Sequence, residues 1–182
     1  MRLFFCVELP EDVRRLLTER SRELRRKLGT AKWVTPENMH ITLRFLGELG
    51  EDTAREIQDM AAELAKEAEP FQVELETLGA FPRAERARVL WVGPAARHER
   101  FARLAHGLEE AVQAAGLPPE RREASPHVTL ARFRSPRNVA QVIAPLPEGP
   151  LAVPVEELVL MSSVLGPQGP TYSPVARLPL KG

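Results

Sequence analysis

The feature that most constrains this chain is a four-residue pattern that occurs twice, as His40-Ile41-Thr42-Leu43 and as His127-Val128-Thr129-Leu130. The 182 residues include only four histidines and eight threonines, so chance composition predicts about 0.2 His-x-Thr pairs. Alternate residues of a strand face opposite sides of a sheet. Each copy therefore turns its His and Thr to one face and its two apolar residues to the other. The apolar faces must be buried, and the polar faces must meet water or a shared cleft.

The apolar pattern around the two copies predicts an alternation of strands and helices. Helices are expected where apolar residues recur at three- and four-residue intervals, at 11–28, 52–68 and 99–115, with a short one near 138–144. Strands are expected where shorter apolar or alternating runs occur, at 3–8, 39–46, 71–78, 86–92, 127–133, 151–165 and 172–178. Residues 33–38 are expected to form a loop that leads into the first motif strand.

This order of elements resembles two related halves, each of which delivers one His-x-Thr strand. We therefore expect an α+β fold built by pseudo-symmetric duplication, with two antiparallel sheets flanking a central cleft and helices outside. No linker longer than a loop separates the halves, so residues 1–182 are expected to form one domain of two intertwined lobes.

Composition narrows the class of protein. The chain has 25 acidic and 25 basic residues, so its formal net charge is zero. This argues against a protein that binds long nucleic acid through an overall positive charge, but it allows a local basic cleft. The single cysteine, Cys6, lies in an apolar run and is expected to be a buried thiol. Neither a signal peptide nor a membrane-spanning stretch is recognised, so we expect a cytoplasmic protein that does not bind membranes, and a monomer.

Two histidines on corresponding strands suit phosphodiester cleavage. One neutral imidazole can accept a proton from water while an imidazolium donates a proton to the leaving oxygen. A single such histidine would more often be structural, but two copies favour a site. The threonine hydroxyls can bind non-bridging phosphate oxygens. A metal site is the weaker interpretation, because the motifs lack carboxylate or cysteine ligands at recognised spacings. The other histidines, His98 and His106, are expected to be structural or solvent-facing.

The chain resembles the 2H phosphoesterases, which are named for two H-x-T-x motifs. More narrowly, it is similar to the bacterial and archaeal RNA 2′,3′-cyclic phosphodiesterases, also called 2′-5′ RNA ligases. The resemblance extends nearly end to end, through the segments 2–5, 33–38, 40–48, 79–82, 89–92 and 126–132 and the region of Tyr172.

The resemblance implies a bilobal fold and hydrolysis of RNA 2′,3′-cyclic phosphate ends to 2′-phosphates, with no metal or cofactor. It makes His40 the general acid and His127 the general base, although pseudo-symmetry alone does not decide which is which. Thr42, Thr129 and Arg132 would bind the phosphate. The implied partners are RNA with cyclic phosphate ends, such as tRNA fragments, or cyclic nucleotides. Two alternatives remain, ATP-independent 2′-5′ ligation and a non-catalytic module that binds RNA ends.

Strand alternation and the resemblance disagree about one residue. Strict alternation puts Arg132 on the face opposite His127, so a bulge, a twist or the length of its side chain must bring it to the site. Otherwise Arg44, which alternation places beside His40 and Thr42, becomes the phosphate ligand. Candidates for stacking a base are Phe5, Phe45 and Tyr172, with burial in the core as the alternative for each.

Overall fold

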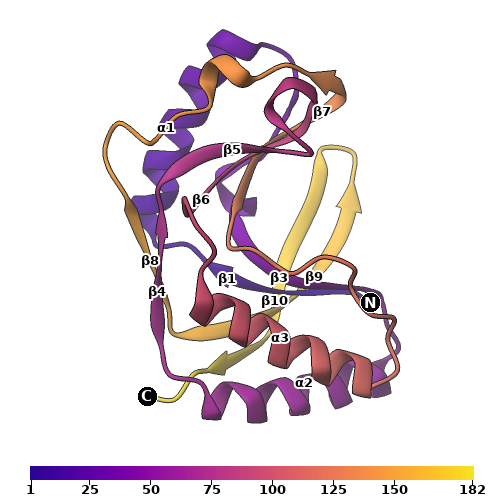
Figure 1. The fold of residues 1–182 in the computed structure, drawn as a ribbon. Helices are drawn as coiled ribbons and strands as arrows, with labels where there is room; N and C mark the ends of the chain where they lie inside the picture. The colour runs from indigo at the N-terminus through magenta and orange to yellow at the C-terminus, as the bar shows by residue number, and fades with distance from the viewer.

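The computed structural model describes all residues from 1 to 182 (Figure 1). The elements in chain order are β1 (Arg2–Glu8), α1 (Glu11–Leu28), β2 (Lys32–Trp33), η1 (Pro36–Asn38), β3 (His40–Glu48), α2 (Glu51–Glu67), β4 (Phe71–Leu75), β5 (Thr77–Phe81), η2 (Ala84–Arg86), β6 (Ala87–Gly93), α3 (Glu99–Ala114), β7 (Val128–Arg137), η3 (Ala140–Val142), β8 (Leu151–Val155), β9 (Glu157–Gly166) and β10 (Gly169–Pro179).

Two antiparallel half-sheets form the frame of the molecule. One has the strand order β10-β9-β1-β3, and the other has the order β7-β6-β5 with β2 paired to β7. They meet where Ile41 of β3 pairs with Val128 of β7, the one residue pair between these strands. The half-sheets thus form a single eight-stranded sheet, and β4 and β8 form a separate two-stranded sheet. The expected α+β architecture with two antiparallel sheets is confirmed. The sequence did not predict that the two sheets are joined by the Ile41–Val128 pair.

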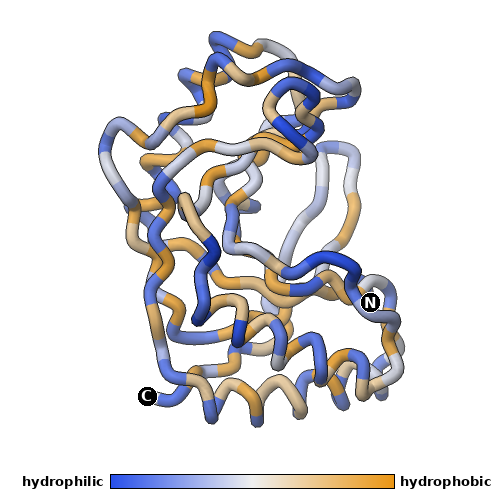
Figure 2. The backbone as a smooth tube through the Cα atoms, in the orientation of Figure 1, coloured by the Kyte–Doolittle hydropathy of each residue, from blue (hydrophilic) through white to orange (hydrophobic).

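The helices lie at the two ends of the molecule. Figure 1 shows α1 at one end, where it contacts β8, and α2 and α3 together at the other end, below β1 and β3. Along α2 and α3, hydrophobic and hydrophilic residues alternate in Figure 2 with the period of a helix that buries one face. Helix α1 has acidic residues in its first turn and Arg25, Arg26 and Lys27 in its last, which complements the helix dipole. It ends at Gly29, which adopts a φ of 74°. None of the three helices is long and apolar enough to cross a membrane.

A single large core lies under the sheet. It contains the apolar face of both motifs, Ile41, Leu43, Val128 and Leu130, each at most 4% exposed. Burying these side chains commits both motif strands to one orientation, because a shift of one residue would turn every side chain to the other face. A smaller cluster on the other face of β1 contains Phe4 and Cys6, which confirms the buried thiol.

The structure corrects three of the predicted elements. The strand expected at 71–78 is two strands in different sheets, β4 and β5, because the chain leaves β4 at Glu76 to pair with β6 instead of β8. Likewise, the strand expected at 151–165 is β8 and β9, which are separated at Glu156. Residues 33–38 are not wholly loop, since Trp33 ends β2 and 36–38 form η1.

Candidate active site

The junction between the half-sheets brings the two motifs together. Since β3 and β7 run antiparallel through the Ile41–Val128 pair, His40 and Thr42 flank that pair on one strand, and His127 and Thr129 flank it on the other. All four polar side chains line one cleft of about 190 Å³. The cleft therefore has an approximate two-fold arrangement, with one His-Thr pair from each half of the chain.

A β-bulge falls at the same place in each motif. In β3, Phe5 pairs with Arg44 and Cys6 with Thr42, so Leu43 has no partner in β1. In β7, Leu90 pairs with Ala131 and Trp91 with Thr129, so Leu130 has no partner in β6. An extra residue in one strand reverses the alternation of every side chain beyond it. Each bulge therefore turns the fifth residue after the His, Phe45 or Arg132, into the cleft.

These bulges resolve the disagreement over the arginines. Arg132 lines the cleft, as the resemblance implied and as strict alternation did not. The prediction that Arg44 shares a face with His40 is wrong: Arg44 is buried (9% exposed) on the far face of the sheet. Its Nε donates to Glu109 Oε2 of α3 at 2.5 Å, and its Nη2 donates to the Pro118 carbonyl. Burial raises the pKa of Glu109, but hydrogen bonds from Arg44, Gln113 and the Glu120 backbone outweigh it and lower that pKa to about 2.

The His40 ring is fixed by two hydrogen bonds. Its Nδ1 lies 2.7 Å from the Asn38 carbonyl oxygen, and its Nε2 lies 2.9 Å from Thr42 Oγ1. A carbonyl only accepts, so Nδ1 carries the hydrogen and, in the neutral ring, Nε2 accepts from the Thr42 hydroxyl. Asn38 is itself held in place, because its Nδ2 donates to the Pro170 carbonyl at the start of β10. The His40 nitrogen that remains for the cleft is therefore Nε2.

His127 is held in the corresponding way. Its Nδ1 lies 2.9 Å from the Ser125 carbonyl oxygen, so Nδ1 donates there and Nε2 again remains for the cleft. In both motifs the carbonyl belongs to the residue two before the histidine. The duplication thus extends to the hydrogen bond that fixes each tautomer.

Aromatic rings enclose both imidazoles. The ring centroids of Phe4 and Tyr172 lie 5.0 and 5.3 Å from that of His40. Those of Phe81 and Trp91 lie 5.1 and 6.1 Å from that of His127. Such packing removes water from each ring and limits its rotation.

Burial also changes the acidity of both rings. It lowers the pKa of His40 to about 4; the Asn38 hydrogen bond opposes the shift, and the charges of Arg132 and His127 add to it. The pKa of His127 is lowered as well, again mainly by burial, with a further contribution from Arg132. In the unliganded protein near neutrality, both histidines are therefore predominantly neutral.

The three predicted stacking residues have different positions. Phe5 is 0% exposed in the main core and cannot reach a nucleotide, because β1 turns it to the face that packs on the helices. Phe45 and Tyr172 both line the cleft. Phe45 is 55% exposed, so its ring is accessible to a nucleotide.

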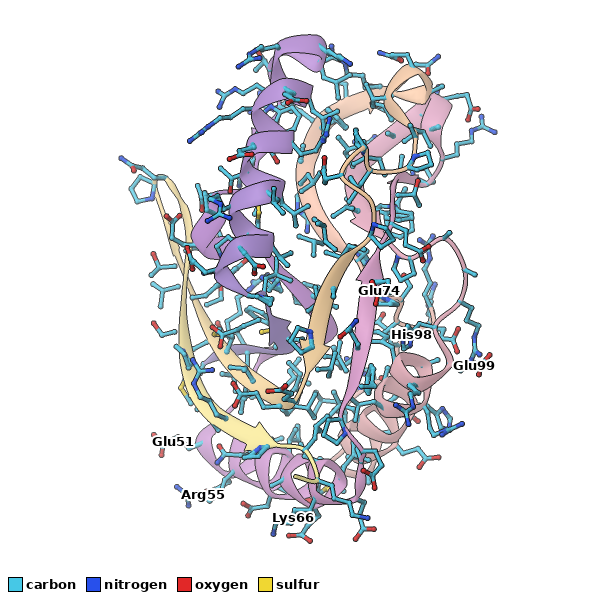
Figure 3. All side chains as sticks on the ribbon, turned by 90° about the vertical axis from the view of Figure 1, so that its left-hand side faces the viewer. Glu51, Arg55, Lys66, Glu74, His98 and Glu99 are labelled. Atoms are coloured by element: carbon cyan, nitrogen blue, oxygen red, sulfur yellow. The ribbon has the colours of Figure 1, made fainter.

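Several residues of the cleft were not predicted from the sequence. Phe4, Phe81 and Trp91 support the histidines, and Lys32 and Gln168 line the opening. A signal existed for Trp91: a Cβ on Gly79 would lie 2.2 Å from its ring, so this glycine marks a close approach of ring to backbone. The other two histidines lie elsewhere, with His98 at the start of α3 (Figure 3) and His106 beside Glu110. No three His, Cys, Asp or Glu side chains are grouped as a metal site would require.

Known proteins that resemble this chain in sequence and in structure belong to one family of phosphoesterases. A family model described as LigT-like phosphoesterase matches twice, over residues 7–91 and 92–172, which are the two halves that contain the motifs. An RNA 2′,3′-cyclic phosphodiesterase of Aeropyrum pernix is 41% identical over 145 residues, covering 78% of this chain and 81% of that protein. The crystal structure of a Thermus thermophilus protein superposes with a TM-score of 0.84 at 36% identity, covering 100% of this chain and 99% of the other. That of E. coli LigT complexed with 3′-AMP gives 0.81 at 27% identity, covering 100% and 98%.

Proposed function

Because the chain belongs to the LigT-like phosphoesterase family, whose curated members are phosphodiester hydrolases acting on RNA 2′,3′-cyclic phosphates, we propose that it hydrolyses such ends to 2′-phosphates by two-histidine acid–base catalysis. The observation that carries the proposal is the paired arrangement of the two motifs. Two histidines, each held through Nδ1 by a backbone carbonyl, present Nε2 to one cleft. A relative that binds 3′-AMP supports a nucleotide as the occupant.

His127 is the general base in this proposal. Its neutral ring has Nε2 free of a protein hydrogen-bond partner, so it can accept a proton from water as the water oxygen attacks phosphorus. The lowered pKa of His127 keeps the ring in the neutral form that this step requires.

His40 is the general acid. Its Nε2 donates a proton to the 3′ oxygen as the P–O3′ bond breaks, which leaves a 3′-hydroxyl and a 2′-phosphate. With an unliganded pKa of about 4, the His40 ring is almost entirely neutral at pH 7 and has no proton on Nε2 to donate. A bound phosphate anion opposes this shift, because it stabilises the imidazolium and screens Arg132. Substrate binding thus raises the pKa of His40 and favours the protonated ring that the general acid requires.

Phosphate binding falls to Thr42, Thr129 and Arg132. The hydroxyls donate to non-bridging oxygens, and the Arg132 guanidinium, which has no carboxylate partner in the structure, balances charge that grows in the transition state. Phe45 and Tyr172 offer a ring to the terminal base.

Ligation is a second candidate that uses the same site. If the 5′-hydroxyl of a second RNA replaced water at His127, the product would be a 2′-5′ bond, and no ATP would be needed. The openness of the cleft toward Phe45, whose ring is 55% exposed, favours access for a second strand. Incubating cyclic-phosphate and 5′-hydroxyl RNA halves with the protein, and testing the junction for nuclease resistance, distinguishes ligation from hydrolysis.

The test of the proposed function is turnover of a 2′,3′-cyclic phosphate oligonucleotide in the presence of a chelator. We expect full activity of the wild type, and losses of about 10²–10⁴-fold for His40→Ala and for His127→Ala. His106→Ala is the matched control, because His106 is exposed on α3 and paired only with Glu110. Tight retention of the oligonucleotide without product would indicate a binding module instead.

A further inference from the structure

The two walls of the cleft differ in charge. Phe45 and Arg132 occupy equivalent places, each the fifth residue after its histidine and each just beyond a bulge. One is an exposed aromatic ring and the other is a guanidinium. The duplication therefore produced two walls of matching geometry whose side chains have diverged.

The basic wall extends beyond Arg132. Lys32 of β2 is the direct cross-strand partner of Arg132 and also lines the cleft. Arg134 lies two residues further along β7, separated from Arg132 by the buried Phe133, so Arg132 and Arg134 share one face of the strand. Lys32, Arg132 and Arg134 are all exposed. We refer to these three residues as the basic strip.

The charges of the basic strip are uncompensated. Some arginines of this chain form ion pairs with carboxylates, such as Arg44 with Glu109, Arg20 with Glu23 and Arg97 with Glu123. None of the three residues of the strip is in an ion pair, and no acidic residue lines the cleft. In a chain of zero formal net charge, this is a local surplus of positive charge at the mouth of the cleft.

No cleft-lining residue of the opposite wall is charged, and the charge of Arg2, which acts on Tyr172, lies outside the lining. This wall is formed by Phe45, by Gln168 of the β9–β10 turn, and by Gly169, Pro170 and Tyr172 of β10. A polyanion that enters the cleft therefore meets the larger positive charge on the side of the basic strip, and its backbone is expected to lie there.

We propose that Lys32 and Arg134 bind the phosphates of the nucleotides that precede the cyclic end, so that single-stranded RNA lies with its backbone along β2 and β7. This inference rests on the proposed function and adds the path of the RNA body. Phosphate contacts of this kind position a strand without reading its sequence. The strip thus makes the protein prefer an oligonucleotide over a cyclic mononucleotide, which offers only the phosphate at the histidines.

The salt dependence of such contacts is predictable. Each phosphate neutralised on a single strand releases about 0.7 of a counterion, so two contacts contribute about −1.4 to the slope of log affinity against log salt. Between about 50 and 200 mM salt, this amounts to about a sevenfold loss of oligonucleotide affinity. Mononucleotide binding lacks this contribution.

The experiment compares a single-stranded pentanucleotide that ends in a 2′,3′-cyclic phosphate with 2′,3′-cyclic CMP. The variants are Lys32→Ala, Arg134→Ala and the double variant. The matched control is Arg55→Ala, an exposed arginine on α2 with no ion pair, at the end of the molecule remote from α1 (Figure 3). We expect kcat/KM for the pentanucleotide to fall about tenfold more than kcat/KM for cyclic CMP in the double variant, with the salt slope reduced by about 1.4.

The experiment distinguishes failure of the inference about the RNA path from failure of the proposed function. If the wild type turns over both substrates and the double variant matches Arg55→Ala on both, the inference about the RNA path is overturned and the proposed function stands. An equal loss on both substrates would also overturn it, because the strip would then act on the reacting phosphate alone. A wild type inactive on both substrates would contradict the proposed function itself.

Discussion

Ile41 and Val128 pair across β3 and β7, and this one pair joins the half-sheet that carries His40 to the half-sheet that carries His127. Both side chains are 0% exposed. The packing that joins the two halves therefore also sets the separation of the two histidines. Loosening this pair should consequently affect catalysis beyond its effect on stability.

Shortening Ile41 tests that consequence. Ile41→Ala should lower the free energy of unfolding by about 2–5 kcal/mol, because it leaves a cavity in the core. It should also lower kcat of the folded fraction, because β3 and β7 lose packing at their junction. Ile57→Ala is the control, since Ile57 is equally buried but lies on α2. Chemical denaturation and kcat of the two variants should show similar stability losses, with a fall in kcat for Ile41→Ala alone.

The two bulges predict opposite roles for two arginines. Arg132→Ala should lower kcat/KM for a cyclic nucleotide by about 10²-fold with little change in stability, because it removes an exposed guanidinium that we propose binds the phosphate. Arg44→Ala should destabilise the fold by about 3–5 kcal/mol, because it leaves the Glu109 carboxylate without its buried partner. Thermal unfolding together with steady-state kinetics of both variants is the measurement. A catalytic loss without destabilisation in Arg44→Ala would contradict the placement.

The pKa of His40 predicts how stability depends on pH. The folded-state value of about 4 lies below the ordinary 6.5, so between these pH values the unfolded chain binds a proton that the folded chain does not. The free energy of unfolding should therefore fall as the pH is lowered from 6.5 toward 4, by up to about 3 kcal/mol. In His40→Asn this contribution should be absent. Denaturation curves of wild type and variant across that range would contradict the assignment if they were parallel.

Gly79 predicts a structural requirement around His127. In Gly79→Ala the new Cβ would meet the Trp91 ring at 2.2 Å, so Trp91 must shift and with it the support of His127. We expect a fall of about 1–3 kcal/mol in stability and a lower kcat. Gly50→Ala, where a Cβ would meet nothing within 4 Å, should leave kcat and the His127 ring unchanged and lower stability only by the cost of Ala at the N-cap of α2. Ring NMR signals of His127 that stay unchanged in Gly79→Ala would contradict the coupling.

Much of this fold could be predicted from the sequence, and the exceptions have local causes. The helix expected at 11–28 is α1 with the same bounds. Its signals, the spacing of its apolar residues and the glycine that follows it, are local in the sequence. The division of 71–78 into β4 and β5 depends on which distant strand each half pairs with, and no local pattern contains that information.

At the site, the prediction of side-chain orientation from strand alternation was wrong beyond the two β-bulges, where the backbone departs from regular pleating. Leu43 and Leu130 read as ordinary strand residues, and neither signals that it lacks a partner on the neighbouring strand. Alternation consequently misplaced Arg44, Phe45 and Arg132, whereas family resemblance correctly implied that Arg132 lies in the cleft. The aromatic residues that enclose the histidines come from β1, β5, β6 and β10, and only the folded sheet brings them together.

The central claim is that two histidines act on one phosphate, with His40 beside the 3′ oxygen. The most direct measurement is end-group analysis of the product formed from a 2′,3′-cyclic phosphate oligonucleotide in ¹⁸O-labelled water. We predict a 2′-phosphate that carries one ¹⁸O atom, formed by the wild type and not by the His40→Ala, His127→Ala double variant. A 3′-phosphate product, or undiminished turnover by the double variant, would contradict that claim.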